Sequence, residues 1–260
     1  FGVRIVHDIV MGIDPRQLAG TILAIPVANP VAFARAKRNT PEEDIAFANL
    51  NRVFPGVRGD SGSGGPAEPI SGRSLTEWIA AALVEHFMPR LDYLLDFHCH
   101  WDVGGLLMLL QELEDGTETN KRAHDMAMYY DVGMINENAA MGVNTATGYA
   151  TSLGVACVPV EVGAGALPEV VQKKALAMCV DGAFNVLRRL EMLPGAPAAP
   201  HRQVSGHIRP HVRPTRAGYL VSNCEPEDLF REGHLGIPVK AGDILAEVFD
   251  PYTLEVVEQI

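Results

Sequence analysis

Ionisable side chains alternate along one apolar stretch of the chain, LLDFHCHWD at residues 94–102. Side chains on a strand alternate between its faces, so Asp96, His98 and His100 share one face and Cys99 lies on the other. An imidazole at the carboxyl end of a strand can bind a metal ion, and a nearby carboxylate can hold the ring in orientation. The same pattern is also typical of polar side chains that only form hydrogen bonds at the end of a strand. The spacing alone leaves both interpretations open.

The elements that must position these residues alternate between strands and helices. Apolar runs at 91–99 and 155–163 are expected as buried strands, and TILAIPV at 21–27 as a short strand. Ser74 and Glu77 have the spacing of a capping box, which begins a helix. Helices are expected at 1–11, 75–88, 120–130 and 168–190. This alternation predicts an α/β fold with helices on both faces of a sheet.

The composition and the hydrophobic pattern of the sequence change after residue 193. The segment 194–202 is rich in proline and alanine and reads as a linker. Short β-rich runs follow, GHIRPHV, AGYLVS, DILAEVFD and TLEVVE, separated by glycine and proline. We therefore expect a catalytic α/β domain at 1–193 and a small β-rich domain at 203–260.

Composition excludes several classes of partner. The 32 acidic and 21 basic residues among 260 give a formal charge of −11, which disfavours nucleic acid. No apolar run is long enough to span a membrane, and no signal peptide is recognisable. The four cysteines lack C-x-x-C pairing and lie in apolar surroundings, as is typical of reduced thiols. A cytoplasmic protein that acts on a small molecule is expected, and a homo-oligomer is left open.

Three segments in order resemble the succinylglutamate desuccinylase/aspartoacylase family of the zinc carboxypeptidase superfamily. They are NPVAFARAKRNTPEEDIAFANLNRVFPG at 29–56, DFHCH at 96–100 and VPVEVG at 158–163. The family pattern has Asn-Pro, an arginine, Asn-Arg-x-Phe, Asp-x-His and a late glutamate on a strand. The resemblance covers most of the chain and implies a three-layer α/β/α fold with a mixed central sheet, followed by a small C-terminal β domain.

The resemblance also implies roles for individual residues. His98 corresponds to the third zinc ligand, and Glu161 to the general base that deprotonates the zinc-bound water. Asn51 and Arg52 resemble the pair that binds a substrate carboxylate, and Arg38 resembles the arginine that stabilises the oxyanion. A zinc ion lowers the pKa of bound water to about 7 and polarises an amide carbonyl. His100 is expected to line the substrate pocket rather than to bind the metal.

The first two zinc ligands of the family come from a His-Gly-x-Glu type of loop, and no such motif occurs in this sequence. A single histidine does not hold zinc firmly, because catalytic sites use three protein ligands. Two explanations follow: the sequence lacks a natural N-terminal segment, which we favour, or the chain is a metal-free relative. Two functional classes therefore stay open. One is a zinc amidohydrolase that deacylates an N-acyl amino acid, and the other is a non-catalytic module that binds a small molecule.

Overall fold

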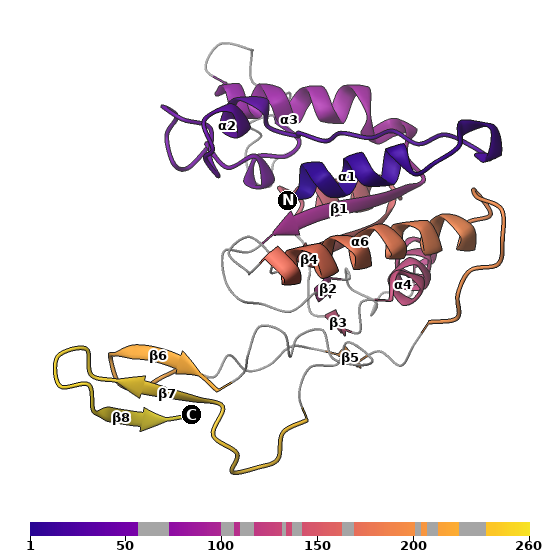
Figure 1. The fold of residues 1–260 in the computed structure, drawn as a ribbon. Coiled ribbons are helices and arrows are strands. Elements are labelled where there is room, and N and C mark those ends of the chain that lie inside the picture. The colour runs from indigo at the N-terminus through magenta and orange to yellow at the C-terminus, as the bar shows by residue number, and fades with distance from the viewer. Residues whose placement is uncertain are drawn as a thin grey trace.

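The protein is represented by a computed structural model in which helices surround one large sheet (Figure 1). The structure describes residues 1–56, 73–99, 107–109, 117–131, 134–136, 142–162, 169–200, 204–206, 213–223 and 238–260.

The large sheet has five strands in the order β1-β4-β2-β3-β5. β4 pairs in parallel with β1 and antiparallel with β2, and β3 is parallel to both β2 and β5. The sheet is therefore mixed, as expected. The strands are β1 (Tyr93–Cys99), β2 (Leu107–Leu109), β3 (Met134–Asn136), β4 (Ala156–Val162) and β5 (Val204–Gly206).

Helices cover both faces of this sheet. On one face, Val158 and Val160 of β4 are fully buried in a core shared with α1 (Gly2–Met11), α4 (Glu118–Tyr130) and α6 (Glu169–Arg189). In Figure 1, α1 and α6 lie side by side across β1 and β4. On the other face, Cys157 belongs to a second core with α3 (Leu75–His86) and α5 (Ala146–Ser152). This is the three-layer α/β/α arrangement that the sequence predicted.

The first turn of α3 contains the predicted capping box. The Ser74 hydroxyl accepts a hydrogen bond from the Glu77 amide at 3.2 Å, and the Glu77 carboxylate accepts one from the Ser74 amide at 2.7 Å. These bonds satisfy two backbone donors that have no partner within the helix. After His86 the chain continues as the short 3-10 helix η3 (Met88–Arg90), with Pro89 in its first turn, and then enters β1.

The expectation of a strand at 21–27 is wrong. These residues form neither helix nor strand, and most of their side chains are exposed, including Leu23 at 39%. The β-branched residues favoured a strand, but β propensity becomes structure only where a neighbouring strand can pair. The short 3-10 helix η1 (Pro15–Gln17) precedes this stretch and α2 (Pro30–Ala34) follows it.

The last part of the chain forms a second, antiparallel sheet. Its strands β6 (Tyr219–Ser222), β7 (Ala246–Phe249) and β8 (Val256–Gln259) confirm the runs predicted in AGYLVS, DILAEVFD and TLEVVE. The run GHIRPHV lies almost wholly outside the described residues. β5, whose residues fall within the range predicted for the β-rich domain, pairs with β3 in the large sheet.

Candidate active site

The candidate metal ligand and the candidate base lie directly opposite each other. In the parallel β1–β4 pair, His98 is the register partner of Glu161, near the carboxyl ends of both strands. Phe97 and Val160 pack into the core beneath α1, α4 and α6. Because side chains alternate along a strand, Asp96, His98 and Glu161 therefore share the opposite face. Open α/β sheets place their ligands at this end of the strands.

Asp96 fixes the imidazole of His98. Its Oδ2 atom lies 2.9 Å from Nε2 of His98, and both side chains are about one quarter exposed. An ionised carboxylate can only accept, so Nε2 is the donor and Nδ1 is left to bind another group. Burial lowers the pKa of His98, but the hydrogen bond and charge of Asp96, aided by Glu161, raise the pKa above its ordinary value, and Arg38 opposes this. A metal ion at His98 must therefore compete with a proton.

Asn51 joins the 3-10 helix η2 (Leu50–Arg52) to the start of α5. Its backbone amide donates to the side chain of Asn49 at 3.0 Å, and its Oδ1 atom accepts from the amide of Ala146 at 2.8 Å. Thr145 caps the same helix end through a bond from the Gly148 amide. One lone pair of the Asn51 amide oxygen is thus used within the protein, and the NH₂ group of Asn51 can donate to a substrate.

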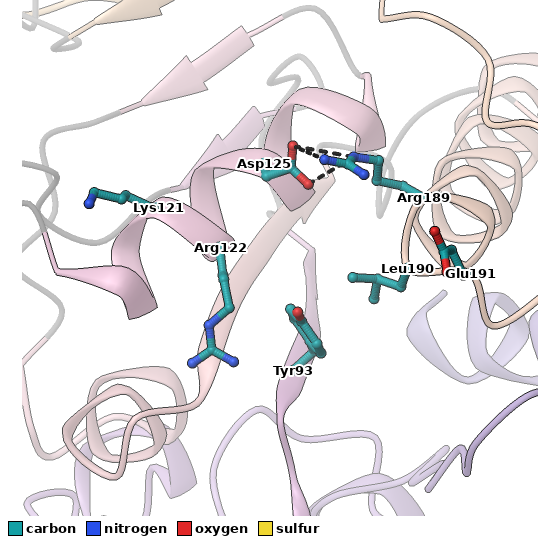
Figure 2. A pocket seen from close by; sticks show the side chains of 7 residues that line it. All are labelled: Tyr93, Lys121, Arg122, Asp125, Arg189, Leu190 and Glu191. Atoms are coloured by element: carbon teal, nitrogen blue, oxygen red, sulfur yellow. Dashed lines mark hydrogen bonds and ion pairs between the residues drawn. The ribbon is translucent and has the colours of Figure 1, made fainter.

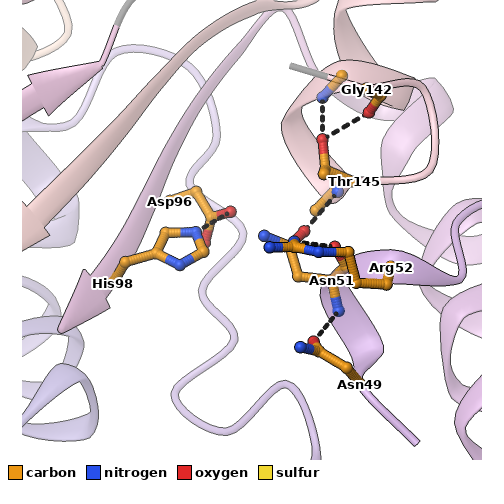
Figure 3. A network of polar contacts seen from close by, with 9 residues as sticks. Asn49, Asn51, Arg52, Asp96, His98, Gly142 and Thr145 are labelled. Atoms are coloured by element: carbon orange, nitrogen blue, oxygen red, sulfur yellow. Dashed lines mark hydrogen bonds and ion pairs between the residues drawn. The ribbon is translucent and has the colours of Figure 1, made fainter. Parts of the chain in front are cut away.

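Arg52 lies at the end of η2 and is exposed. Its Nη1 atom donates to the carbonyl of Asn51 at 2.6 Å, which uses one of the five donors of the guanidinium. The side chain of Asn144 donates to the carbonyl of Arg52 at 3.3 Å. Figure 3 shows the side chains of Asn51 and Arg52 extending from η2 toward Asp96 and His98. A planar guanidinium in this place is suited to a carboxylate.

Of the other two predicted site residues, the structure describes Arg38 but not His100. Arg38 is exposed and follows α2, which Asn29 caps through a bond from the Ala32 amide at 3.0 Å. Its positive charge acts on the pKa of His98, so Arg38 lies within electrostatic reach of the site. His100 lies outside the described residues.

The residues that the structure describes do not form a complete zinc site. Within them, no group of three His, Cys, Asp or Glu side chains is arranged to hold a metal ion. His98 has the surroundings of a metal ligand, because its ring is oriented by a carboxylate, but three protein ligands are needed. A zinc ion bound to His98 would need two further protein ligands, which the described residues do not supply.

A solvent-open pocket of about 420 Å³ lies away from this site. It opens at Tyr93, the first residue of β1, whereas His98 is near the other end of that strand. Arg189 in its wall is paired with Asp125, with Nε 3.0 Å from Oδ2 (Figure 2). Its walls are formed by Tyr93, Lys121, Arg122, Asp125, Arg189, Leu190 and Glu191. The pocket contains none of the predicted site residues.

Comparison with protein families identifies the chain. A family model for the succinylglutamate desuccinylase/aspartoacylase catalytic domain matches residues 1–190. The chain belongs to this family. Membership of this family supports the conclusion, at the level of the family, that the protein is an enzyme that hydrolyses acyl-amino acids. Comparison with curated protein sequences gives no match.

Three solved structures share the fold of this chain. The product-bound ectoine utilization protein EutE (DoeB) of Ruegeria pomeroyi is 22% identical with a TM-score of 0.70, over 99% of this chain and 72% of that one. A succinylglutamate desuccinylase of Silicibacter sp. TM1040 is 18% identical with a TM-score of 0.71, over 99% and 71%. A succinylglutamate desuccinylase/aspartoacylase of Rhodobacter sphaeroides is 17% identical with a TM-score of 0.71, over 99% and 72%.

Sequence reasoning missed α5, which holds η2 in place. Its sequence, ATGYATS, contains a glycine and β-branched threonines, all poor helix formers. The usable signal was Asn144-Thr145, because threonine favours the position that caps a helix.

None of the helices in the described part of the chain is long and apolar enough to cross a membrane.

Proposed function

We propose that the protein is a zinc-dependent hydrolase that removes the acyl group from an N-acyl amino acid or a similar small amide bearing a carboxylate. The observation that carries this proposal is the placement of Glu161 directly opposite His98 in the β1–β4 register. Arg52 extends toward the same place from η2 (Figure 3). A base, a metal-binding imidazole and a carboxylate-binding guanidinium are the groups that hydrolysis of such an amide requires.

Each residue has a distinct role in this proposal. Glu161 accepts a proton from the attacking water and returns it to the leaving amine. Arg52, with the NH₂ group of Asn51, binds the substrate carboxylate, and Arg38 stabilises the negative charge that develops on the carbonyl oxygen. His100 is assigned a role in binding the substrate. When bound, zinc polarises the amide carbonyl and lowers the pKa of water.

A metal-free binding module is the second candidate. It is favoured by the lack of any complete group of metal ligands among the residues in the described ranges. Such a module would use Arg52 and Asn51 to hold a carboxylate and would have no need of a base opposite His98. The presence of Glu161 at that position therefore supports the hydrolase.

The test measures zinc and hydrolysis on the same sample of the natural protein. Zinc content is determined per chain, and release of free amine is followed for a panel of N-acyl amino acids. We expect about one zinc per chain, and Glu161→Gln should keep the metal while turnover falls by about 10²- to 10⁴-fold. His98→Ala should lose both. A natural protein without zinc and without turnover would favour the binding module.

The free thiols support the expected cytoplasmic location. Cys99, Cys157 and Cys179 are all free, as is usual for proteins in a reducing compartment.

A further inference from the structure

The segment that carries Arg38 is fixed on its N-terminal side by the end of α2. The amide of Ala36 donates to the carbonyl of Phe33 at 3.0 Å, and the amide of Lys37 donates to the carbonyl of Ala32 at 2.9 Å. These two bonds form a Schellman motif, with Ala36 in the left-handed region at φ 49°. Residues with a side chain rarely adopt this conformation. It sets the direction in which the chain enters Arg38.

On the other side, the segment is fixed at Thr40. Thr40 is 3% exposed, and its amide donates to the carbonyl of Ala48 at 2.9 Å. Its hydroxyl accepts from Nδ2 of Asn29 at 2.9 Å and lies 2.5 Å from the hydroxyl of Thr76. Thr76, in the first turn of α3, is 0% exposed. Arg38 is therefore two residues from a buried anchor.

Glu43 completes this anchor. Its carboxylate accepts from the amide of Thr76 at 3.2 Å and also from the Thr76 hydroxyl. A hydroxyl has one proton, so Thr76 donates to the carboxylate and Thr40 donates to Thr76. Every hydroxyl proton is then used. We call Thr40, Glu43 and Thr76 the Thr76 clasp.

Location at the start of α3 strengthens the Thr76 clasp. The amide of Thr76 is among the first amides of that helix, which have no acceptor within it. A carboxylate beside such amides is stabilised by their aligned dipoles. Glu43 therefore ties a segment that lies 33 residues earlier in the chain to the N-terminus of a rigid helix.

We propose that the Thr76 clasp positions Arg38 for the reacting carbonyl. The proposal rests on the hydrolase function proposed above. The Thr76 clasp contacts neither His98 nor Glu161 in any hydrogen bond of the described residues, so it acts on the site through Arg38. Together with the end of α2, it holds the backbone of Arg38 between two fixed points, which leaves the guanidinium fewer directions in which to extend.

The experiment compares Thr76→Val with Thr76→Ser in the natural, metal-loaded protein. Valine keeps the volume of threonine and removes the hydroxyl, whereas serine keeps the hydroxyl. The first measurement is the rate of limited trypsin cleavage after Arg35, Lys37 and Arg38, which does not depend on activity. We expect cleavage to rise about tenfold in Thr76→Val, as for loss of one hydrogen bond to a charged acceptor, and to stay near the wild-type rate in Thr76→Ser.

The second measurement is a double-mutant cycle with Arg38→Ala. We expect Thr76→Val to lower kcat about tenfold with little change in KM, and to have no further effect once Arg38 is alanine. Equal losses in both backgrounds would mean a general structural effect and would overturn the proposal. So would unchanged cleavage in Thr76→Val. Faster cleavage in Thr76→Val, in a protein whose wild type hydrolyses no amide, would reject the hydrolase function and leave the Thr76 clasp as the element that orders the Arg38 segment.

Discussion

Gly182, in the middle of α6, is a position where a helix-favouring substitution should destabilise the protein. Alanine is intrinsically better than glycine in a helix by about 1 kcal/mol. A Cβ atom at Gly182, however, would lie 2.6 Å from the carbonyl oxygen of Tyr130 and 2.9 Å from its ring. Tyr130 is 1% exposed, and its hydroxyl donates to the carbonyl of Cys179 at 2.8 Å. Neither the backbone nor the ring of Tyr130 can move aside easily.

The expected change follows from these opposing effects. Overpacking a core costs about 1–3 kcal/mol, and a contact with backbone belongs at the upper end of that range. After the gain in helix propensity, Gly182→Ala should lower the free energy of unfolding by about 2 kcal/mol. For a domain of this size that corresponds to a fall in Tm of about 4–8 °C.

Urea and thermal unfolding followed by circular dichroism would measure this change. Gly2→Ala is the control, because its new methyl group would have its nearest neighbour at 3.9 Å. Gly2 begins helix α1, which alanine also favours, so the Tm of this variant should not fall. A Gly182→Ala protein more stable than wild type would show that α4 and α6 do not approach each other as described.

Three further outcomes are expected. Arg52→Lys should raise KM about tenfold for carboxylate-bearing substrates and leave uncharged amides unaffected in steady-state assays, since lysine lacks the planar fork; an equal effect on both would remove the role of Arg52. Ser74→Ala should lower stability by about 1 kcal/mol in urea unfolding through loss of the helix cap, and an unchanged midpoint would contradict this. Burial raises the pKa of Cys157 and of Cys179 to about 12, so iodoacetamide at pH 8 should label exposed Cys99 and spare both in peptide mapping. Equal labelling of Cys157 and Cys99 would refute the burial of Cys157.

The strands of the large sheet could be predicted where their own residues carry the signal. β4 is a continuous apolar run because helices cover both of its faces. In β1, the polar residues Asp96 and His98 appear on one face only near the end of the strand, which marked the site. The capping box at Ser74 marked the start of α3 for the same reason, since both of its partners lie within one turn.

The assembly of the site could not be read from local patterns. The pairing of His98 with Glu161 depends on the register between two strands that are distant in sequence, and neither strand alone specifies it. The contact of Asn51 with Ala146 and that of Glu43 with Thr76 are likewise long-range. The prediction of a strand at 21–27 failed although the local signal was present, because these β-branched residues pair with no strand of the described residues.

The distance in sequence between β1 and β4 determines when the site can form. Pairing these strands closes a loop of roughly 60 residues, which costs chain entropy before any contact compensates it. During synthesis, Arg52 and His98 leave the ribosome well before Glu161. A nascent chain that ends before β4 thus contains the groups proposed to bind a carboxylate but not the proposed base. The proposed hydrolysis therefore requires that the pairing of β1 with β4 is complete.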